Sequence, residues 1–377
     1  MPTRFGKFIL SKHFSTIFLI LMPVAVLVTA WQTEWAISFL LGRSHIWGIA
    51  YILLSLLTIL TVAFDRAVKV KHRRTSCVVK ILTCFLLYDV MLVVPWFVIA
   101  RILPAPETLE AVVTIILVLA DIVLVVFGYK NTKKVVHKKY QLSIPGCKNP
   151  CRIALISDLH LGIFVREDHV KKVVQCINSM KPDLVVIAGD IIDVDHAILN
   201  DREELNAISR QLQKLSSKSG TYLSLGNHDP GIDDRTFRKF LKSSHIRLLH
   251  NEVVELSDLI LAGRSDAASN ERKPLPEIQA RVSGEKPVIL IDHDPQGIPE
   301  AEQCGIPLVL SGHTHKGQFW PMGFFTKWAN GKHYFYGHET FGNTQAIISS
   351  GAGYFNLPLR IGSDNELVEI VINGKEG

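Results

Sequence analysis

The sequence predicts a chain of two parts: an N-terminal bundle of about four transmembrane α-helices, followed by an α/β domain of alternating strands and helices. The 377 residues are 48% hydrophobic, which is too apolar for an ordinary soluble protein of this length. The basic excess lies in the first 145 residues, with 16 Lys and Arg against 6 Asp and Glu; the rest has 25 against 29. We therefore expect a multi-span region at 1–130, a basic juxtamembrane linker at 131–149 and the α/β domain at 150–377.

Four apolar windows approach the roughly 20 residues that a helix needs to cross a bilayer. They cover about 14–31, 45–64, 77–102 and 109–129. Basic residues precede the first window, separate the second from the third and follow the fourth, so the positive-inside rule places the α/β domain in the cytoplasm. A cleaved signal peptide is the competing interpretation of the first window, and three further spans favour a retained helix. The sequence thus predicts a multi-pass protein of the cell membrane.

The other polar features of this region have modest interpretations. The positive charge flanks apolar segments, so it does not predict nucleic-acid binding. Asp89 and Asp121 lie inside predicted spans, where an ionisable side chain is costly, and we expect helix-to-helix hydrogen bonding there rather than transport. Cys147 and Cys151 form the one close cysteine pair, and a cytoplasmic position predicts two thiols rather than a disulfide.

From about residue 145 the pattern changes to short β-branched strands that end in Asp, Asn, His or Gly. The expected strands are 153–157, 184–188, 221–225, 288–291 and 308–310, with a helix at 168–180. Open α/β sheets place their ligand sites at the carboxyl ends of such strands. We therefore expect the polar side chains that follow these strands to form one site.

Five short motifs supply these side chains. Asp158 and His160 come first, spaced so that an extended chain places both on one face. That motif alone is weak, because an Asp after a strand is more often a turn residue. The candidate metal ligands are Asp158, His160, Asp190, Asn227, His293, His313 and His315. Seven oxygen and nitrogen donors without a thiolate suit two divalent metal ions of the Mn, Fe or Zn type.

Two such ions about 3.5–4 Å apart can activate a bridging water and stabilise the attacking and leaving oxygens of a displacement at phosphorus. The donor set therefore predicts phosphoester hydrolysis. For Asp193 and Asp229 a supporting or turn role competes equally with direct catalysis, and for Asp292 and Asp294 capping of a turn before Pro295 is favoured.

The order of these motifs resembles the calcineurin-like metallophosphoesterase family over most of residues 150–372. The resemblance implies a four-layer α/β/β/α sandwich. It also implies that Asp158, His160 and His315 hold one metal ion, that Asn227, His293 and His313 hold the other, and that Asp190 bridges both. By the same resemblance, the catalytic residues are His228, which contacts the phosphate and protonates or stabilises the leaving oxygen, and Asp229, which would orient the His228 ring.

Within the family, the Gly-His-Thr-His-x-Gly-Gln sequence and an expected strand at 349–353 are most similar to a bacterial membrane-associated branch that includes UDP-2,3-diacylglucosamine pyrophosphatases. Lys316 departs from that branch, which commonly has Gly there. Its side chain either binds an extra phosphate oxygen or points into solvent. Asn365 also departs, since it replaces the usual Pro before Glu-Leu.

The segment 318–328 is the most apolar and aromatic part of the α/β domain. It predicts an interfacial segment or an acyl-chain cradle, with core packing under a loop as the alternative. Together with the membrane spans, it favours a lipid-linked phosphoester or diphosphate as substrate, either UDP-2,3-diacylglucosamine-like or a phospholipid headgroup. An anchored phosphodiesterase for soluble, including cyclic, nucleotides is the second hypothesis. A non-catalytic membrane scaffold is the third, and the complete ligand set argues against it.

Overall fold

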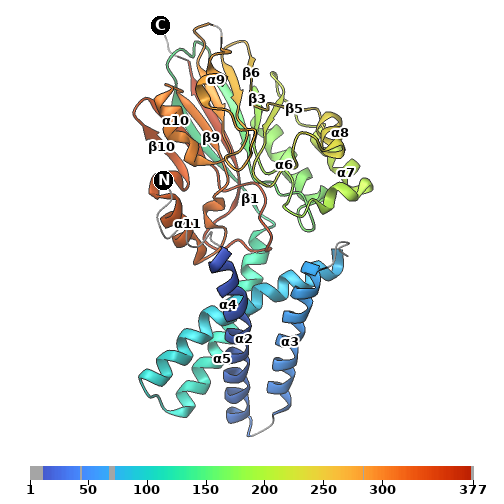
Figure 1. The fold of residues 1–377 in the computed structure, drawn as a ribbon, viewed down its shortest axis with the longest axis vertical. Coiled ribbons are helices and arrows are strands. Elements are labelled where there is room, and N and C mark those ends of the chain that lie inside the picture. The colour runs from blue at the N-terminus through green and yellow to red at the C-terminus, as the bar shows by residue number, and fades with distance from the viewer. Residues whose placement is uncertain (1–11, 43–44, 68–72, 283, 375–377) are drawn as a thin grey trace. The chain divides into compact units, whose positions relative to one another are not determined.

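The computed structural model describes residues 12–42, 45–67, 73–282 and 284–374. The chain divides into two compact units, an N-terminal helical unit up to residue 130 and an α/β unit of residues 131–356 and 360–377. The elements of both units are labelled in Figure 1.

Among the described residues, the helical unit has four long helices, one over each apolar window of the sequence. They are α2 (Lys12–Leu40), α3 (Ile46–Ala67), α4 (Arg73–Ile102) and α5 (Glu107–Asn131). Within the described residues, two segments, 74–102 and 107–131, are long and apolar enough to cross a membrane. By length and hydropathy, therefore, two helices qualify as membrane spans where about four were expected.

Buried polar side chains connect these helices. Tyr51 of α3 donates a hydrogen bond to Asp89 of α4 at 2.6 Å, which confirms the helix-to-helix bonding expected of Asp89. Gln32 and Arg101 both donate to Glu110, at 2.9 and 2.7 Å. Asp121 is also buried, and its Oδ1 has no hydrogen-bond partner in the described part of the chain. For Asp121 the expected hydrogen bond therefore stays a prediction.

Two six-stranded sheets form the α/β unit. The first has the order β1 (Val135–Ser143), β12 (Asn365–Asn373), β2 (Cys151–Ile156), β3 (Leu184–Ala188), β4 (Thr221–Ser224) and β5 (Ile246–Leu248). The second has the order β10 (Gly337–Phe341), β11 (Thr344–Ile348), β9 (Leu308–Ser311), β8 (Val288–Ile291), β7 (Ile260–Gly263) and β6 (Glu252–Glu255). The helices are α6 (Glu167–Met180), α7 (Arg202–Leu212), α8 (Arg235–Ser243), α9 (Leu275–Gln279), α10 (Ile298–Gln303) and α11 (Met322–Asn330), and short 3-10 turns cover Ala197–Asn200, Pro295–Gly297, His315–Gly317 and Lys332–Tyr334.

Three apolar cores show how these elements are layered. One core joins the two sheets to each other, for example Ile153 and Leu155 of β2 with Leu308 of β9. A second joins the first sheet to α6, α7 and α8, and a third joins the second sheet to α9 and α10. Strands β2, β3 and β4 are apolar throughout because both of their faces are covered. The expected order of helices, sheet, sheet and helices is therefore observed (Figure 1).

Strand direction decides where the site lies. Strands β2 to β5 are parallel, as are β7, β8, β9 and β11, so the carboxyl ends in each set share one edge. Strand β12 is antiparallel to β2 and parallel to β1, and Val368 pairs with Leu155 while Asn365 pairs with Val135. Strands β1 and β12 therefore begin at the edge where β2 ends. The chain enters the α/β unit at its carboxyl edge.

The structure corrects two expectations. The middle of the expected linker at 131–149 is strand β1, Val135–Ser143, in which His137 and Lys139 pair with the buried Glu369 of β12 at 2.9 and 3.4 Å. Their basic charge marks one face of a strand as well as a membrane flank, which is why the sequence alone favoured a linker. The strand expected at 349–353 is a loop that follows β11, and Gly351 has a φ of 90° there.

Candidate metal centre

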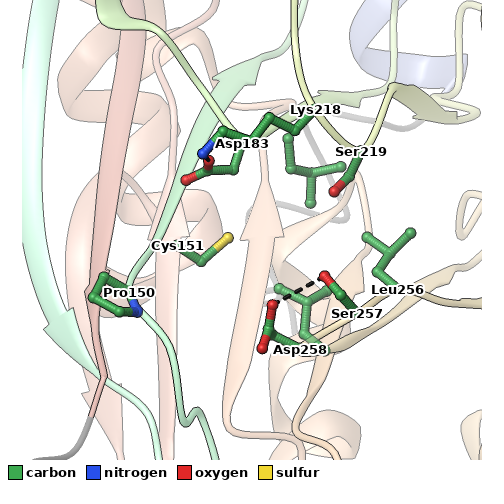
Figure 2. A pocket seen from close by; sticks show the side chains of 10 residues that line it. Pro150, Cys151, Asp183, Lys218, Ser219, Leu256, Ser257 and Asp258 are labelled. Atoms are coloured by element: carbon green, nitrogen blue, oxygen red, sulfur yellow. Dashed lines mark hydrogen bonds and ion pairs between the residues drawn. The ribbon is translucent and has the colours of Figure 1, made fainter.

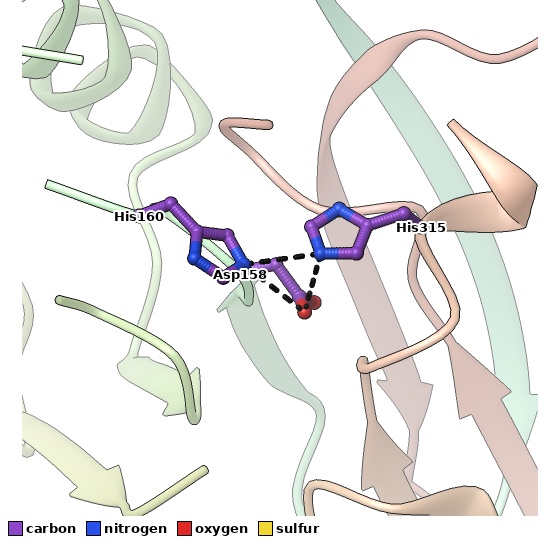
Figure 3. A group of neighbouring side chains, drawn as sticks. All are labelled: Asp158, His160 and His315. Atoms are coloured by element: carbon purple, nitrogen blue, oxygen red, sulfur yellow. Dashed lines mark hydrogen bonds and ion pairs between the residues drawn. The ribbon is translucent and has the colours of Figure 1, made fainter. Parts of the chain in front are cut away.

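Asp158, His160 and His315 form one group of potential ligands at the carboxyl edge of β2, shown in Figure 3. The Nε2 atoms of the two histidines are 3.0 Å apart. Asp158 Oδ1 is 3.4 Å from His315 Nε2 and 4.0 Å from His160 Nε2. All three residues are buried, so a carboxylate and two imidazole nitrogens share one small space.

Asp158, Asp190 and His293 form a second group. His293 Nε2 is 3.1 Å from Asp190 Oδ2, and its Nδ1 is bonded to the Ala188 carbonyl at 2.7 Å. A carbonyl only accepts hydrogen bonds, so Nδ1 carries a proton there and Nε2 is free to act as a ligand. Asp190 Oδ2 also lies 3.7 Å from His160 Nε2 of the first group. Asp158 belongs to both groups and Asp190 lies between them.

Asn227 and His313 lie beside the second group. His313 Nδ1 is 2.9 Å from Asn227 Oδ1, and the His313 ring is 5.2 Å from that of His293. The His313 backbone N–H donates to both oxygens of Asp158 at 3.1 Å. The structure thus gathers all seven sequence-predicted ligands at one edge, five of them in the two compact groups.

The residues present fit divalent metal ions. Asp158, Asp190 and His293 have at most 1% of their surface exposed, and buried carboxylates are costly unless a cation compensates them. Nδ1 of His315 is buried without a hydrogen-bond partner among the described residues, while His293 Nε2 and His160 Nδ1 face the carboxylates of Asp190 and Asp193, at 3.1 and 3.4 Å. Oxygen and nitrogen donors without thiolate are the set that Mn, Fe and Zn accept together.

The electrostatics of the second group also attract a cation. Burial raises the pKa of Asp190, but the neighbouring His293 and His160 lower it further, so the carboxylate is ionised. Burial lowers the pKa of His293, and Asp190 more than reverses this, so the pKa lies well above its ordinary value. The pair therefore holds positive charge strongly, whether a proton or a metal ion supplies it.

The backbone is strained where the ligands attach. Asp158, His160, Asp190, His313 and His315 have φ values of 48°, 48°, 52°, 71° and 50°, in the left-handed region that non-glycine residues seldom adopt. Such strain persists only where the surrounding structure enforces it, and it concentrates at functional sites. The strand-end turns therefore hold the ligands in place at the expense of local stability.

Two glycines allow the carboxylates to approach the backbone. A Cβ at Gly226 would collide with Asp190 Oδ1, and a Cβ at Gly312 would collide with Asp158 Oδ2. These positions exclude any side chain because carboxylate and backbone share the space. The glycines before Asn227 and His313 are thus required by the site rather than by a turn alone.

His228 lies at the mouth of the site. Its ring is 5.4 Å from the His160 ring and stacks on Phe355 at 4.9 Å, and its backbone N–H donates to Asp190 Oδ1 at 2.8 Å. Burial lowers the pKa of His228, and Asp190 offsets this only in part. The ring therefore tends to be neutral unless a negative ligand lies beside it.

Asp229 is placed differently from the orienting role that the family resemblance implied. Its Oδ2 accepts hydrogen bonds from the backbone N–H groups of Asp190 and Gly226, both at 2.9 Å, and its Oδ1 accepts from Ile192 at 3.0 Å. Burial and Asp190 raise its pKa to about 7. These contacts join the ligand-bearing ends of β3 and β4, so the carboxylate holds loops rather than the His228 ring.

The remaining candidate carboxylates have distinct roles. Asp193 Oδ1 is 3.4 Å from Nδ1 of His160, a contact that supports a ligand from behind. Asp294 accepts from the Gln296 N–H at 2.9 Å, which confirms the expected cap. For Asp292 the capping interpretation is wrong: it is fully buried and accepts two hydrogen bonds from Arg272, at 2.9 and 2.7 Å. No local pattern predicts that an arginine 20 residues earlier reaches it.

Lys316, whose role the sequence left open, lies beside the site rather than in it. Its Nζ is 4.4 Å from the centre of the Tyr336 ring. It lines a groove of about 250 Å³ whose other walls are Phe319, Trp320, Gly323, Phe324, Lys327, Phe335, Ile361 and Gly362. The groove therefore adjoins the metal ligand His315 through the next residue in the chain.

Two residues of the site gave no signal in the sequence. Phe355 packs against the rings of His228, His160 and His315, with centroids 4.9, 5.6 and 6.4 Å away. Arg360 is fully buried and donates to the carbonyls of His315 and Ser350, at 3.1 and 2.9 Å. Neither belongs to a motif, and only the return of the chain from β11 to β12 brings them to the carboxyl edge.

A separate pocket of about 170 Å³, shown in Figure 2, lies at the opposite, amino ends of β2 and β3. Cys151, Asp183, Lys218 and Ser257 are among its lining residues. Burial raises the pKa of Asp183, but Lys218, 2.5 Å away, lowers it below its usual range. Ser257 donates a hydrogen bond to Asp258 at 2.9 Å, and no residue that lines this pocket is a candidate ligand.

Comparison with known proteins identifies the family. Residues 151–317 match the family model described as calcineurin-like phosphoesterase. An uncharacterized metallophosphoesterase of Campylobacter jejuni is 32% identical over 282 residues, which cover 72% of this chain and 73% of that protein. Fold, ligand set and similarity agree that this is a metal-dependent phosphoesterase. The chain belongs to the calcineurin-like phosphoesterase family.

Two other relatives are similar over a smaller share of their length. A zebrafish protein named transmembrane protein with metallophosphoesterase domain is 31% identical, over 69% of this chain and 62% of its own. An uncharacterized metallophosphoesterase of Helicobacter pylori strain J99 is 33% identical, over 57% of this chain and 58% of its own. This chain therefore spans less than two thirds of both relatives.

Proposed function

We propose that this protein is a membrane-anchored hydrolase with two divalent metal ions that cleaves a lipid-linked phosphoester or diphosphate. In this proposal Asp158, His160 and His315 hold one ion, and Asp190 lies between the two. Asn227, His293 and His313 hold the other. The observation that best supports this proposal is that the chain enters the α/β unit at the edge where these ligands gather.

Divalent ions at such a site polarise a phosphoryl oxygen and lower the pKa of a water molecule, which supplies the nucleophile for hydrolysis. The chain's own residues bind and orient the phosphate. We assign to the His228 ring a contact with the phosphate and protonation of the leaving oxygen. Burial keeps its pKa low in the free protein, and the negative charge of a bound phosphate opposes that effect, so the ring gains its proton when substrate binds. Asp229 holds the loops that carry Asp190 and His228.

The proposed membrane anchoring supports the proposal of a lipid-linked substrate. Helix α5 ends at Asn131 and β1 begins at Val135, so a short connection joins an apolar helix to the carboxyl edge of the sheet. The apolar groove beside Lys316 has room for part of an acyl chain, and its lysines suit an anionic headgroup. In the proposed topology four helices cross the cell membrane and the α/β domain is cytoplasmic. A UDP-2,3-diacylglucosamine-like glycolipid and a phospholipid headgroup are the two specific forms.

The test compares a lipid with a small ester on the full chain in lipid nanodiscs with Mn²⁺. We expect hydrolysis of the soluble ester bis(p-nitrophenyl) phosphate and of a phospholipid or diacylglycolipid diphosphate. The Phe324→Ser variant should lower kcat/KM for the lipid about tenfold or more and leave the soluble ester unchanged, because Phe324 lines the groove and its side chain is exposed. Val194→Ser, another exposed apolar position, is the matched control.

Three outcomes would contradict parts of the proposal. Equal loss of both activities in the groove variant would remove the lipid-binding role of the groove. Turnover of nucleotides with none of lipids would favour a soluble substrate. No turnover of any ester by a folded, metal-loaded chain would favour a membrane scaffold.

A further inference from the structure

Helix α11 carries an exposed apolar surface that the metal centre does not use. In the described part of the α/β unit, all large hydrophobic side chains that are exposed lie between residues 320 and 328, except Val194. They are Trp320, Met322, Phe324, Phe325 and Trp328, with exposed fractions of 46, 40, 69, 45 and 47%. Soluble domains seldom expose so many large apolar side chains in one short stretch, and a patch of this kind marks an interaction surface.

The patch has two faces. Phe324 and Lys327 line the groove next to Lys316. Met322, Phe325 and Trp328 follow one another at intervals of three, and a helix places residues at this spacing on a common face. We call these three residues the outer face of α11; none of them lines the groove. No residue of α11 is buried, so neither face serves as core packing.

The helix is firmly attached where it begins. The Trp320 N–H donates to the Ile361 carbonyl at 2.8 Å, and Phe319 forms a β-bridge with Ile361. The Cα of Gly323 lies so close to Gly317 that a side chain at Gly317 would collide with it. The outer face is therefore presented by an ordered helix and is not an exposed loop tip.

The same edge of the unit receives the chain from the apolar helix α5. Asn131, where α5 ends, donates to the carbonyl of Arg360 at 3.2 Å. The next residue, Thr132, accepts from Asn365 at 2.7 Å. Arg360 directly precedes Ile361, the residue to which α11 is attached. Asn131 and the start of α11 are thus attached to neighbouring residues of the domain, Arg360 and Ile361.

We propose that α11 is an interfacial helix whose outer face inserts into the headgroup region of the bilayer that anchors the chain. The partner is an anionic phospholipid surface. Aromatic and aliphatic side chains with nearby lysines are the composition that lies at such a boundary, where Trp is enriched. Lys316 and Lys327 flank the patch, and Lys130, Lys133 and Lys134 lie where the chain leaves α5, so charge complements anionic lipid.

Anchoring of the chain in the membrane explains why so short a helix would be enough to bind the bilayer surface. A helix of nine residues binds membranes weakly on its own, since few side chains are buried. Anchoring by α5 converts that weak contact into an intramolecular one with a high effective concentration. The inference rests on the membrane anchoring of the proposed function but not on the identity of its substrate.

The test measures the depth of one side chain in the bilayer. The full chain, with its six cysteines replaced, carries Phe325→Cys labelled with an environment-sensitive nitrobenzoxadiazole dye. It is reconstituted into vesicles of phosphatidylethanolamine and phosphatidylglycerol. Ser257→Cys is the matched control, because Ser257 is exposed and lies at the opposite, amino end of the strands (Figure 2).

We expect blue-shifted emission at position 325 and quenching by spin-labelled lipid at least about twofold stronger than at position 257. Adding Met322→Ser and Trp328→Ser should reduce the quenching at 325, with the thermal unfolding of each variant checking that it is folded. Equal, water-like emission at both positions would overturn the inference, and self-quenching between chains without lipid quenching would assign the face to a second copy. Quenching at 325 without lipid hydrolysis would contradict only the proposed substrate.

Discussion

Asp292→Asn tests whether the buried acid beside the ligand His293 is part of the framework of the site. Asp292 is fully buried, accepts two hydrogen bonds from Arg272, and lies 3.5 Å from Arg264. Asparagine keeps the shape of the side chain but removes its charge. Two guanidinium groups would then lose their shared carboxylate in a place that water hardly reaches.

The magnitude follows from what each arginine retains. Breaking a buried ion pair by removing one partner costs about 3–5 kcal/mol. Arg264 still pairs with Glu300 at 2.6 Å, and Arg272 still donates to the Ser265 carbonyl at 2.7 Å, so we expect the lower end, about 3 kcal/mol. For a unit of this size that corresponds to a fall of about 6–12 °C in Tm.

The assay is thermal unfolding of the full chain in detergent, followed by near-ultraviolet circular dichroism. Asp294→Asn is the matched control, because Asp294 only caps a turn and asparagine caps as well as aspartate. Its Tm should change by less than about 2 °C. If Asp292→Asn were no more destabilising than Asp294→Asn, the structural role assigned to the Asp292–Arg272 pair would be refuted.

Three further predictions concern charge and metal. Burial raises the pKa of Glu204, but Arg166, 2.8 Å away, lowers it below its usual range. The ion pair therefore stabilises the folded state fully above the unfolded pKa of about 4.3. This stabilisation is lost as the pH falls through the lower pKa of the folded state. Glu204→Gln should thus cost about 0.5–1 kcal/mol at pH 7, since the pair is partly exposed and Arg166 keeps Asp201 at 2.7 Å, and less as the pH falls, measured by Tm against pH. Chelation should lower Tm and Mn²⁺ restore it, because Asp158 and Asp190 lose their counter-charge; an unchanged Tm would count against bound metal. His228→Ala should slow hydrolysis of a soluble ester about 10²–10⁴-fold with unchanged metal content, and loss of metal would instead show a structural role.

Much of the framework was predictable from local pattern. Apolar runs such as 184–188 and 288–291 have the observed bounds of β3 and β8, because strands buried on both faces leave a continuous apolar signal. Strand β1 was missed because its adjacent Lys138 and Lys139 continue the basic run that begins at Lys130 and so resemble a membrane flank. Strands β5 and β6, of three and four residues, have the sequences Ile-Arg-Leu and Glu-Val-Val-Glu, so their charged residues break the apolar run that marks β8.

For the site, the sequence supplied the ligands but not the residues that hold them. Asp158, His160 and Asp190 follow strand ends, so motif and position agree. Phe355 and Arg360 reach the site only through the packing of a loop between β11 and β12. Some side chains act through tertiary contacts, and these contacts leave no pattern in the local sequence. Asp229, which accepts hydrogen bonds from three backbone amides, is an example.

The most direct test of the account is the metal content of the full chain purified in Mn²⁺, measured by plasma mass spectrometry together with hydrolysis of bis(p-nitrophenyl) phosphate. A dinuclear centre should give about two ions per chain and metal-dependent turnover. Asp190→Asn should lower both, because Asp190 lies between the two ligand groups. A folded chain that binds no metal, or one whose metal content and turnover are unaffected by Asp190→Asn, would contradict the dinuclear centre.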